Sequence, residues 1–295
     1  MKKYYFFTLI FLFLIFFSCK NDKKEFSAFK ITDDIGKELS FDSIPKRIVS
    51  LAPSITESLF EIGASENVIA VTDYCNYPQE TNSKIRVGGI IDPNIEVIAS
   101  IKPDLILTTV EGNSKSAYQS LINLGYKVFA SNPRNTDGII KMLRDFGKIT
   151  DKELNAKKLI NKIDSTRNSY KDIQSKIAVK PRAVVLVSLN PLITVNSSTY
   201  INEIINLSGY NNIFADESLP YPVINGESVL LRNPEYIILI SELADASGEY
   251  LNTLNKYFSG TDALKNDKII IIDSDILSRP GPRVLNAINF LFSKK

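Results

Sequence analysis

The side chains that could do chemistry in this sequence are carboxylates, lysines and two thiols, because the chain contains no histidine. It therefore lacks the usual general base, the Ser-His-Asp triad and imidazole ligands for zinc or haem. Asp73, Glu111 and Asp275 could supply paired carboxylates to an α/β enzyme, but no Gly-x-Ser-x-Gly nucleophile motif accompanies them. No His/Asp/Glu cluster has the spacing of metal ligands. The sequence predicts no catalytic residue and no metal site.

The first thiol, Cys19, directly follows a short secretory signal. Lys2 and Lys3 precede an apolar run of about 14 residues, whereas a membrane-spanning helix needs about 20. We expect residues 1–18 to be a lipoprotein-type signal peptide, cleaved so that lipid is attached to the thiol of Cys19. Residues 19–28 would then form a tether. The expected location is extracytoplasmic, as a membrane-anchored lipoprotein; an ordinary signal peptide with an incidental cysteine is the alternative.

The charge balance of the chain gives no sign of a nucleic-acid partner. The sequence has 35 Lys and Arg against 33 Asp and Glu, and removing a signal that holds Lys2 and Lys3 makes the two totals equal. A near-neutral protein has no global electrostatic attraction for nucleic acid. With Cys19 lipidated, Cys75 would be the one remaining thiol, so no disulfide is expected within the chain.

Short apolar runs alternate with helical patterns over residues 29–150, which we expect to form an N-terminal α/β lobe. Buried strands are predicted at 47–51, 68–71, 105–108 and 128–130, with helices at 53–62, 95–101 and 117–124. Residues 29–41 alternate around an Asp-Asp-Ile-Gly turn and predict a β-hairpin. The repeated order of strand and helix implies a parallel sheet with helices on both faces.

One long helix is predicted to join this lobe to a second one. Thr150 and Glu153 have the spacing of a capping box. Apolar residues then recur at helical intervals: Leu154, Leu159, Ile160, Ile163, Ile173 and Ile177. A helix over 151–178 would be roughly 40 Å long, enough to run along both lobes. The second lobe, 179–295, is predicted to have strands at 183–187, 236–240 and 268–272 and helices at 200–207 and 284–292.

Several short motifs are distributed over residues 29–292. They are PKRIVSLAPSITE at 45–57, VTDYCNYP at 71–78, VGG at 87–89, IKPDLI at 101–106, NIF at 212–214 and RPGPR at 279–283. On these motifs the sequence resembles the helical-backbone class of periplasmic solute-binding proteins, the cobalamin and iron–siderophore receptors of ABC importers. The resemblance implies two Rossmann-like lobes with parallel sheets, joined by one long helix. It also implies a monomer without catalysis or cofactor that delivers a small molecule to the permease dimer of an ABC transporter.

The resemblance further implies a ligand cleft between the lobes, at the carboxyl ends of the strands. In the first lobe its residues would be Ser54, Asp73, Tyr74, Cys75, Tyr77, Gly88, Gly89, Ile90 and Thr109. In the second lobe they would be Asn190, Tyr200, Tyr221, Asp275 and Arg279. Aromatic faces suit a large flat macrocycle, and adjacent glycines let it approach the backbone. The tryptophan-rich pocket of a cobalamin receptor is not reproduced, since the chain has no tryptophan.

Two of these assignments keep two interpretations. Cys75 is either a ligand of cobalt, because thiolates coordinate soft transition metals, or a small unreactive pocket residue. Asp275 and Arg279 either pair with each other or form hydrogen bonds with polar groups of the ligand.

One exposed glutamate in each lobe is implied to dock onto the permease. By position these are Glu96, at the start of a helix, and Glu227 in the second lobe. Each would bind an arginine of the permease through a bidentate pair of hydrogen bonds. Taken alone, Glu96 is also explained as a favourable charge in the first turn of a helix.

The ligand favoured by the YCNYP and GG motifs is a corrinoid such as cobalamin. A ferric siderophore is the alternative, although an anionic complex would favour more cleft cations than Arg279 and Arg283. Haem is less favoured because its usual histidine ligand is absent, although tyrosine can replace it. An extracellular enzyme or a surface adhesin is a more distant alternative. A cleft lined by Tyr74, Tyr77 and Tyr221 would argue against the adhesin.

Overall fold

The computed structural model describes residues 27–244 and 248–295. The predicted signal peptide 1–18, Cys19 and most of the tether 19–28 lie outside these residues. Within the described ranges, none of the helices combines the length and the apolar character that crossing a membrane requires.

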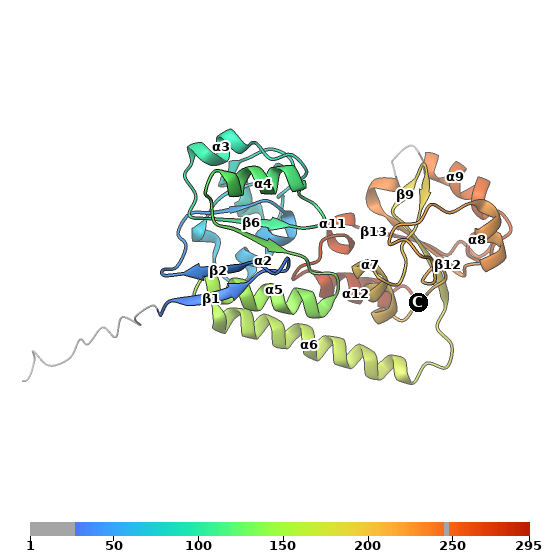
Figure 1. Cartoon of the computed structure of the whole chain (residues 1–295). Coiled ribbons are helices and arrows are strands. Elements are labelled where there is room, and N and C mark those ends of the chain that lie inside the picture. The colour runs from blue at the N-terminus through green and yellow to red at the C-terminus, as the bar shows by residue number, and fades with distance from the viewer. Residues whose placement is uncertain (1–26, 245–247) are drawn as a thin grey trace, which may run out of the picture.

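The N-terminal lobe is built on a five-stranded parallel sheet (Figure 1). Its strands, in spatial order, are β5 (Ile85–Arg86), β4 (Val68–Val71), β3 (Ile48–Ser50), β6 (Leu105–Thr109) and β7 (Val128–Ser131). Its helices are α2 (Pro53–Glu61), α3 (Ile95–Ser100), α4 (Lys115–Asn123) and α5 (Thr136–Ile149), with short 3₁₀ turns at Ser65–Asn67 and Gln79–Ser83. The predicted hairpin is present as β1 (Phe29–Thr32) and β2 (Glu38–Phe41).

The C-terminal lobe contains a four-stranded parallel sheet. Its spatial order is β11 (Asn211–Asn212), β8 (Arg182–Leu186), β12 (Tyr236–Ile240) and β13 (Ile269–Ile272). Its helices are α7 (Tyr200–Leu207), α8 (Gly226–Arg232), α9 (Glu249–Phe258), α10 (Asp262–Lys265), α11 (Ser274–Leu277) and α12 (Val284–Phe292). A hairpin of β9 (Ser188–Leu189) and β10 (Leu192–Ile193) and a 3₁₀ turn at Ser241–Leu243 complete it. The predicted pair of parallel α/β lobes is confirmed.

The long helix α6 (Glu153–Ser175) runs beneath both lobes, as predicted (Figure 1). The predicted capping box is wrong. The Thr150 hydroxyl donates to the carbonyl of Phe146 and closes α5, while α6 begins after Lys152 without a side-chain cap. The predicted apolar stripe is also only partly buried: Ile163 is fully buried, whereas Leu154 is 78% exposed. The inner face packs on the shared core through Ala156, Leu159, Ile160, Ile163 and Tyr170, and the outer face of the helix is polar.

A single cluster of buried apolar side chains extends through both lobes. It includes Leu107 on β6, Phe146 on α5, Ile163 on α6, Ile204 on α7 and Ile288 on α12. Each sheet also has a separate apolar cluster on its opposite face, one in the C-terminal lobe and one in the N-terminal lobe. The lobes therefore share one hydrophobic core across their boundary instead of packing as two separate cores.

The packing of α5 on α6 depends on Gly147. A Cβ there would lie 2.6 Å from the Cβ of Ala156 and 3.3 Å from the Cα of Glu153. Replacing Gly147 with valine is expected to lower the free energy of unfolding by about 1–3 kcal/mol, because overpacking forces the two helices apart. Urea denaturation measures the change. Adding Ala156→Gly should restore part of the loss, and a Gly147→Val variant as stable as the parent would contradict the close approach.

Candidate functional site

A cavity of about 940 Å³ lies between the two lobes. Its walls come from the loops that follow β3, β4, β5, β6 and β7 in one lobe and β11, β12 and β13 in the other. The lining residues are Ala52, Pro53, Ser54, Tyr74, Ile90, Thr109, Glu111, Gly112, Asn132, Pro133, Arg134, Leu219, Pro220, Tyr221, Ile240, Glu242, Ser274, Asp275, Ser278, Arg279 and Pro280. The carboxyl ends of both parallel sheets therefore face one shared space, where α/β folds commonly bind ligands.

The structure brings half of the predicted ligand-binding residues together at this cavity. Those that line it are Ser54, Tyr74, Ile90, Thr109, Tyr221, Asp275 and Arg279. Asp73 lines an adjoining open hollow of about 570 Å³, which it shares with Tyr74, Asp275 and Arg279. The other predicted residues lie elsewhere in the described part of the chain.

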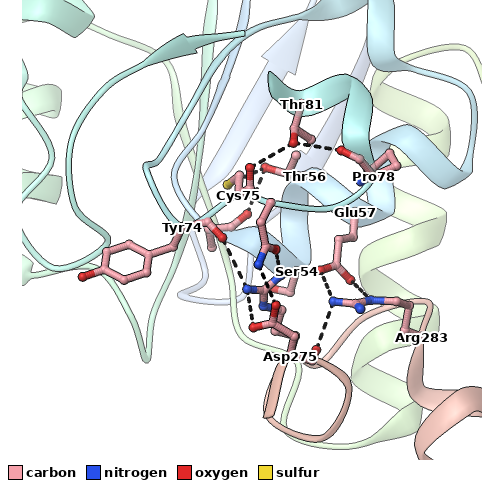
Figure 2. A network of polar contacts seen from close by, with 12 residues as sticks. Ser54, Thr56, Glu57, Tyr74, Cys75, Pro78, Thr81, Asp275 and Arg283 are labelled. Carbon is pink, nitrogen blue, oxygen red and sulfur yellow. Dashed lines mark hydrogen bonds and ion pairs between the residues drawn. The ribbon is translucent and has the colours of Figure 1, made fainter. Parts of the chain in front are cut away.

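Cys75 lies behind the cavity wall. Its side chain is fully buried, and its Sγ lies 3.2 Å from the hydroxyl oxygens of both Thr56 and Thr72 (Figure 2). The thiol is therefore hydrogen-bonded to two hydroxyl groups inside the lobe. Cys75 is not among the residues that line the cavity. This position fits the interpretation of a small unreactive residue better than that of a cobalt ligand.

Tyr77 and Tyr200 also lie away from the cavity lining. Tyr77 borders a separate small hollow next to α2, with the guanidinium carbon of Arg283 4.5 Å from its ring centre. Tyr200 is buried at the start of α7, and burial raises the pKa of its phenol, with the charges of Glu203 and Glu57 adding to the effect. Its hydroxyl has no hydrogen-bond partner.

The remaining predicted residues belong to turns. Gly88 has a φ of +87°, and a Cβ there would lie 3.3 Å from the backbone nitrogen of Asn94. Glycine is therefore needed for the chain to turn into α3. Gly89 follows it in the same turn, and Asn190 lies exposed between β9 and β10.

Two tyrosines from opposite lobes form exposed aromatic surfaces of the cavity. The side chain of Tyr74 is 60% exposed and that of Tyr221 is 47% exposed. Figure 2 shows the Tyr74 ring projecting away from the polar contacts behind it. Partial burial raises the pKa of Tyr221, and the nearby carboxylate of Glu111 in the other lobe adds to this effect. Both rings are therefore accessible for stacking.

Sequence reasoning missed the Arg134–Glu111 pair. The two side chains line the cavity with 3.2 Å between Arg134 Nη2 and Glu111 Oε1, and each is about half exposed. Glu111 was considered only as a possible catalytic carboxylate. Glu111 and Arg134 lie three and four residues after the predicted strands 105–108 and 128–130, and this position in loops at the strand ends is the signal that could have identified the pair. Among the described residues, no group of three or more His, Cys, Asp and Glu side chains is arranged to hold a metal ion.

Glu57 joins the two lobes and was also missed. Its carboxylate, 1% exposed on α2, accepts from Arg279 Nη1 at 2.8 Å. It also accepts from Arg283 Nε at 2.8 Å and from Arg283 Nη2 at 2.6 Å (Figure 2). Burial by itself would lower the pKa of Arg283, but the hydrogen bonds and charge of Glu57 outweigh it and raise that pKa. The lobes thus meet through a buried ion-pair cluster.

A second carboxylate crosses the lobe boundary in the opposite direction. Glu203 on α7 accepts from the backbone nitrogen of Thr136 at 2.6 Å and from its hydroxyl at 2.7 Å. Thr136 is the first residue of α5, so the carboxylate also lies at the positive end of a helix. With the Glu57 cluster, this contact fixes the lobes relative to each other on two sides of the shared core.

The two predicted docking glutamates occupy equivalent places in their lobes. Glu96 is the second residue of α3 and Glu227 the second residue of α8, and both are exposed. An asparagine caps each helix: Asn94 accepts from Val97 N, and Asn225 accepts from Ser228 N. Each carboxylate is therefore held at the surface next to a capped helix start.

The sequence and the fold are both similar to those of known proteins. A model of the family described as "Periplasmic binding protein" matches residues 48–276. The Vitamin B12-binding protein of Vibrio cholerae serotype O1 is 31% identical over 245 residues, which cover 82% of this chain and 86% of that protein. The crystal structure of the periplasmic vitamin B12 binding protein BtuF of Vibrio cholerae has a TM-score of 0.75 at 28% identity, covering 85% of this chain and 96% of that one.

A third similar structure is described as a possible iron-binding (periplasmic solute-binding) protein from Staphylococcus epidermidis. It has a TM-score of 0.74 at 27% identity and covers 85% of this chain and 99% of that one. The family match spans the helix between the lobes and most of both lobes, and it includes all the residues that line the cavity except Ser278, Arg279 and Pro280. The chain therefore belongs to the periplasmic binding protein family.

Proposed function

We propose that this protein captures a corrinoid outside the cytoplasmic membrane and delivers it to the permease of an ABC importer. Lipid attached to Cys19 would hold it at the membrane, and the tether would leave the two lobes free to reach the permease. The similarity to vitamin B12-binding proteins supports the ligand class. A solute-binding role requires no chemistry on the ligand, which agrees with a chain that contains no histidine.

The observation that carries this proposal is the interlobe cavity with Tyr74 and Tyr221 on its opposite walls. Its volume of about 940 Å³ suits a large macrocycle. Aromatic rings that remain exposed offer flat apolar surfaces with polar tips, which suits stacking on a macrocycle with amide groups at its edge. Ile90, Thr109 and Leu219 also line the cavity and add apolar groups to its wall.

Isothermal titration of the purified mature protein with cyanocobalamin, and then with dicyanocobinamide, tests the proposal. Submicromolar binding of either compound would support it, and a comparison of the two would show whether the nucleotide loop is sensed. Absence of binding to both would contradict the corrinoid and favour a ferric siderophore, the alternative ligand. A panel of ferric siderophores, together with haem, would then identify the ligand.

Tyr221 is expected to contribute directly to affinity. Replacing Tyr221 with alanine should weaken ligand binding by about 1–3 kcal/mol, because a partly exposed ring that stacks on the ligand is removed. Tyr221→Phe is the matched control, since it keeps the ring and should retain most of the affinity. Titration calorimetry on both variants gives the two values. Unchanged affinity in the alanine variant would exclude Tyr221 from the binding site.

We further propose that Glu96 and Glu227 set the register of the protein on a two-fold permease. The equivalent placement of the two carboxylates supports this role, because each lobe offers the same Asn-x-Glu arrangement at a helix start. Arginine side chains of the permease would bind each carboxylate in a bidentate fork.

A further inference from the structure

Arg279 lines the cavity, yet its hydrogen-bond donors are already committed. A guanidinium carries five N–H groups, four of them on the two Nη atoms. Nη1 donates to Glu57 Oε1 and to Asn76 Oδ1, both at 2.8 Å. Nη2 donates to the carbonyl of Tyr74 at 3.3 Å and is ion-paired with the carboxylate of Asp275. The fork that would bind a carboxylate of a ligand is therefore occupied by the protein itself.

The two carboxylates that hold Arg279 are placed differently. Glu57 belongs to the N-terminal lobe and is buried, whereas Asp275 is part-exposed on α11 and lines the cavity. Asp275 is itself fixed across the lobe boundary, because Asn76 Nδ2 donates to its Oδ2 at 2.8 Å. The guanidinium is thus neutralised from behind by one carboxylate and from the cavity side by the other.

The other arginine at the cavity is paired in the same manner. Arg134 forms an ion pair with Glu111, and both side chains line the cavity. Among the described lining residues, the cations are Arg134 and Arg279, while the carboxylates are Glu111, Glu242 and Asp275. The wall of the cavity therefore carries more negative than positive charge, and both of its cations have a carboxylate partner.

We propose that Glu57 and Asp275 are specificity-determining residues, which neutralise Arg279 so that the cleft rejects ligands bearing carboxylates. The ligand class selected is a neutral or cationic macrocycle. The inference rests on the proposed function only in taking the interlobe cavity as the solute site. It assigns to a buried residue, Glu57, an effect on ligand charge that it exerts through Arg279 without touching the ligand.

Two matched pairs of macrocycles test this inference. Haemin and its dimethyl ester share one ring and differ in two carboxylates. Cyanocobalamin and its monocarboxylic acids differ in one amide. For each pair, the ratio of affinity for the acid to affinity for the neutral compound is measured by titration with the purified mature protein. The variants are Asp275→Asn and Glu57→Gln, with Asp42→Asn as the control, because Asp42 is an exposed carboxylate that does not line the cavity.

Asp275→Asn is expected to raise the acid-to-neutral ratio about tenfold, the order expected for one unit charge roughly 10 Å away at an effective dielectric constant near 20. Glu57→Gln should shift the ratio in the same direction, and Asp42→Asn should leave it unchanged. If Glu57→Gln does not fold, the ratio measured with Asp275→Asn tests the inference by itself. This variant is expected to fold, because the Asp275 side chain is part-exposed. A change in overall stability alone would lower both affinities together and leave the ratio constant.

The outcomes separate this inference from the proposed function. Ratios that stay within twofold of the parent in both variants would overturn the inference while leaving corrinoid binding intact. A parent protein that binds haemin dimethyl ester but not cyanocobalamin, and whose ratio shifts in Asp275→Asn, would support the inference and contradict the corrinoid. Failure of every macrocycle to bind any variant would overturn both, because the cavity would not be a site for this class of solute.

Discussion

Replacing Glu57 with leucine is expected to lower the free energy of unfolding by about 3–5 kcal/mol, among the largest effects available to a single substitution in this chain. The reason is that two guanidinium groups, those of Arg279 and Arg283, would stay largely buried without their shared carboxylate. Leucine fills a similar volume, so the loss reports on charge and not on a cavity. Urea denaturation followed by circular dichroism measures the change.

Two comparisons make this result interpretable. Glu61→Leu changes an exposed glutamate at the end of the same helix and should alter the unfolding free energy by less than about 0.5 kcal/mol. A variant that also replaces Arg279 and Arg283 with methionine should recover part of the loss, because an apolar side chain at a buried site costs less than a guanidinium that has lost the carboxylate of Glu57. A Glu57→Leu protein as stable as its parent would show that the ion pair does not hold the lobes.

Reversing the charge of both docking glutamates is expected to abolish transport while leaving ligand affinity intact. In the Glu96→Lys/Glu227→Lys variant, each lobe would present a lysine to the arginine that we propose on the permease, so attraction would become repulsion at both contacts. Neither residue lines the interlobe cavity, so capture of the ligand should be unaffected. Uptake in cells and ligand-stimulated ATP hydrolysis by the reconstituted permease measure the first effect, and titration calorimetry measures the second.

A control with the same change in charge distinguishes docking from a general electrostatic effect. Glu80→Lys/Asp172→Lys reverses two exposed carboxylates that lie away from the starts of α3 and α8, and it should transport normally. Each single reversal at Glu96 or Glu227 should give a partial loss. Weakened ligand binding in the double variant, or normal transport by it, would argue against the docking role.

Much of the fold was predictable because buried parallel strands have an unambiguous pattern. The runs that became β12 and β13 are almost purely apolar and rich in β-branched residues, and they pair with each other over four residues. Only β12 is a central strand: β13 lies at the edge of the sheet, which the apolar run alone did not indicate. Short amphipathic elements were harder to recognise. Helices α8 and α10 have seven and four residues, and each has one fully buried residue, Val229 and Ala263, so neither shows a full period of buried apolar positions.

The site was less predictable than the fold, because its contacts join residues far apart in the chain. Glu57 occurs within an ordinary amphipathic helix, and nothing in that pattern shows that it faces Arg283, 226 residues later. The sequence also does not show which way a loop side chain points. Tyr74 and Cys75 are neighbours, but the Tyr74 ring is exposed at the cavity and the Cys75 thiol is fully buried. Strand ends could be located from the sequence, whereas the direction of each side chain beyond them could not.

The shared core has a consequence for how the molecule behaves as a whole. The topology divides the chain into two lobes with a helix between them. The free energy of unfolding cannot be assigned to the two lobes separately, because they share one apolar core. Cutting the chain between α6 and β8 would strip apolar partners from Phe146 and Ile163 on one side and from Ile204 and Ile288 on the other. Separating the two parts would also remove the groups that Glu57 and Glu203 bind in the other lobe. In energetic terms the protein is one cooperative unit, although its architecture has two parts.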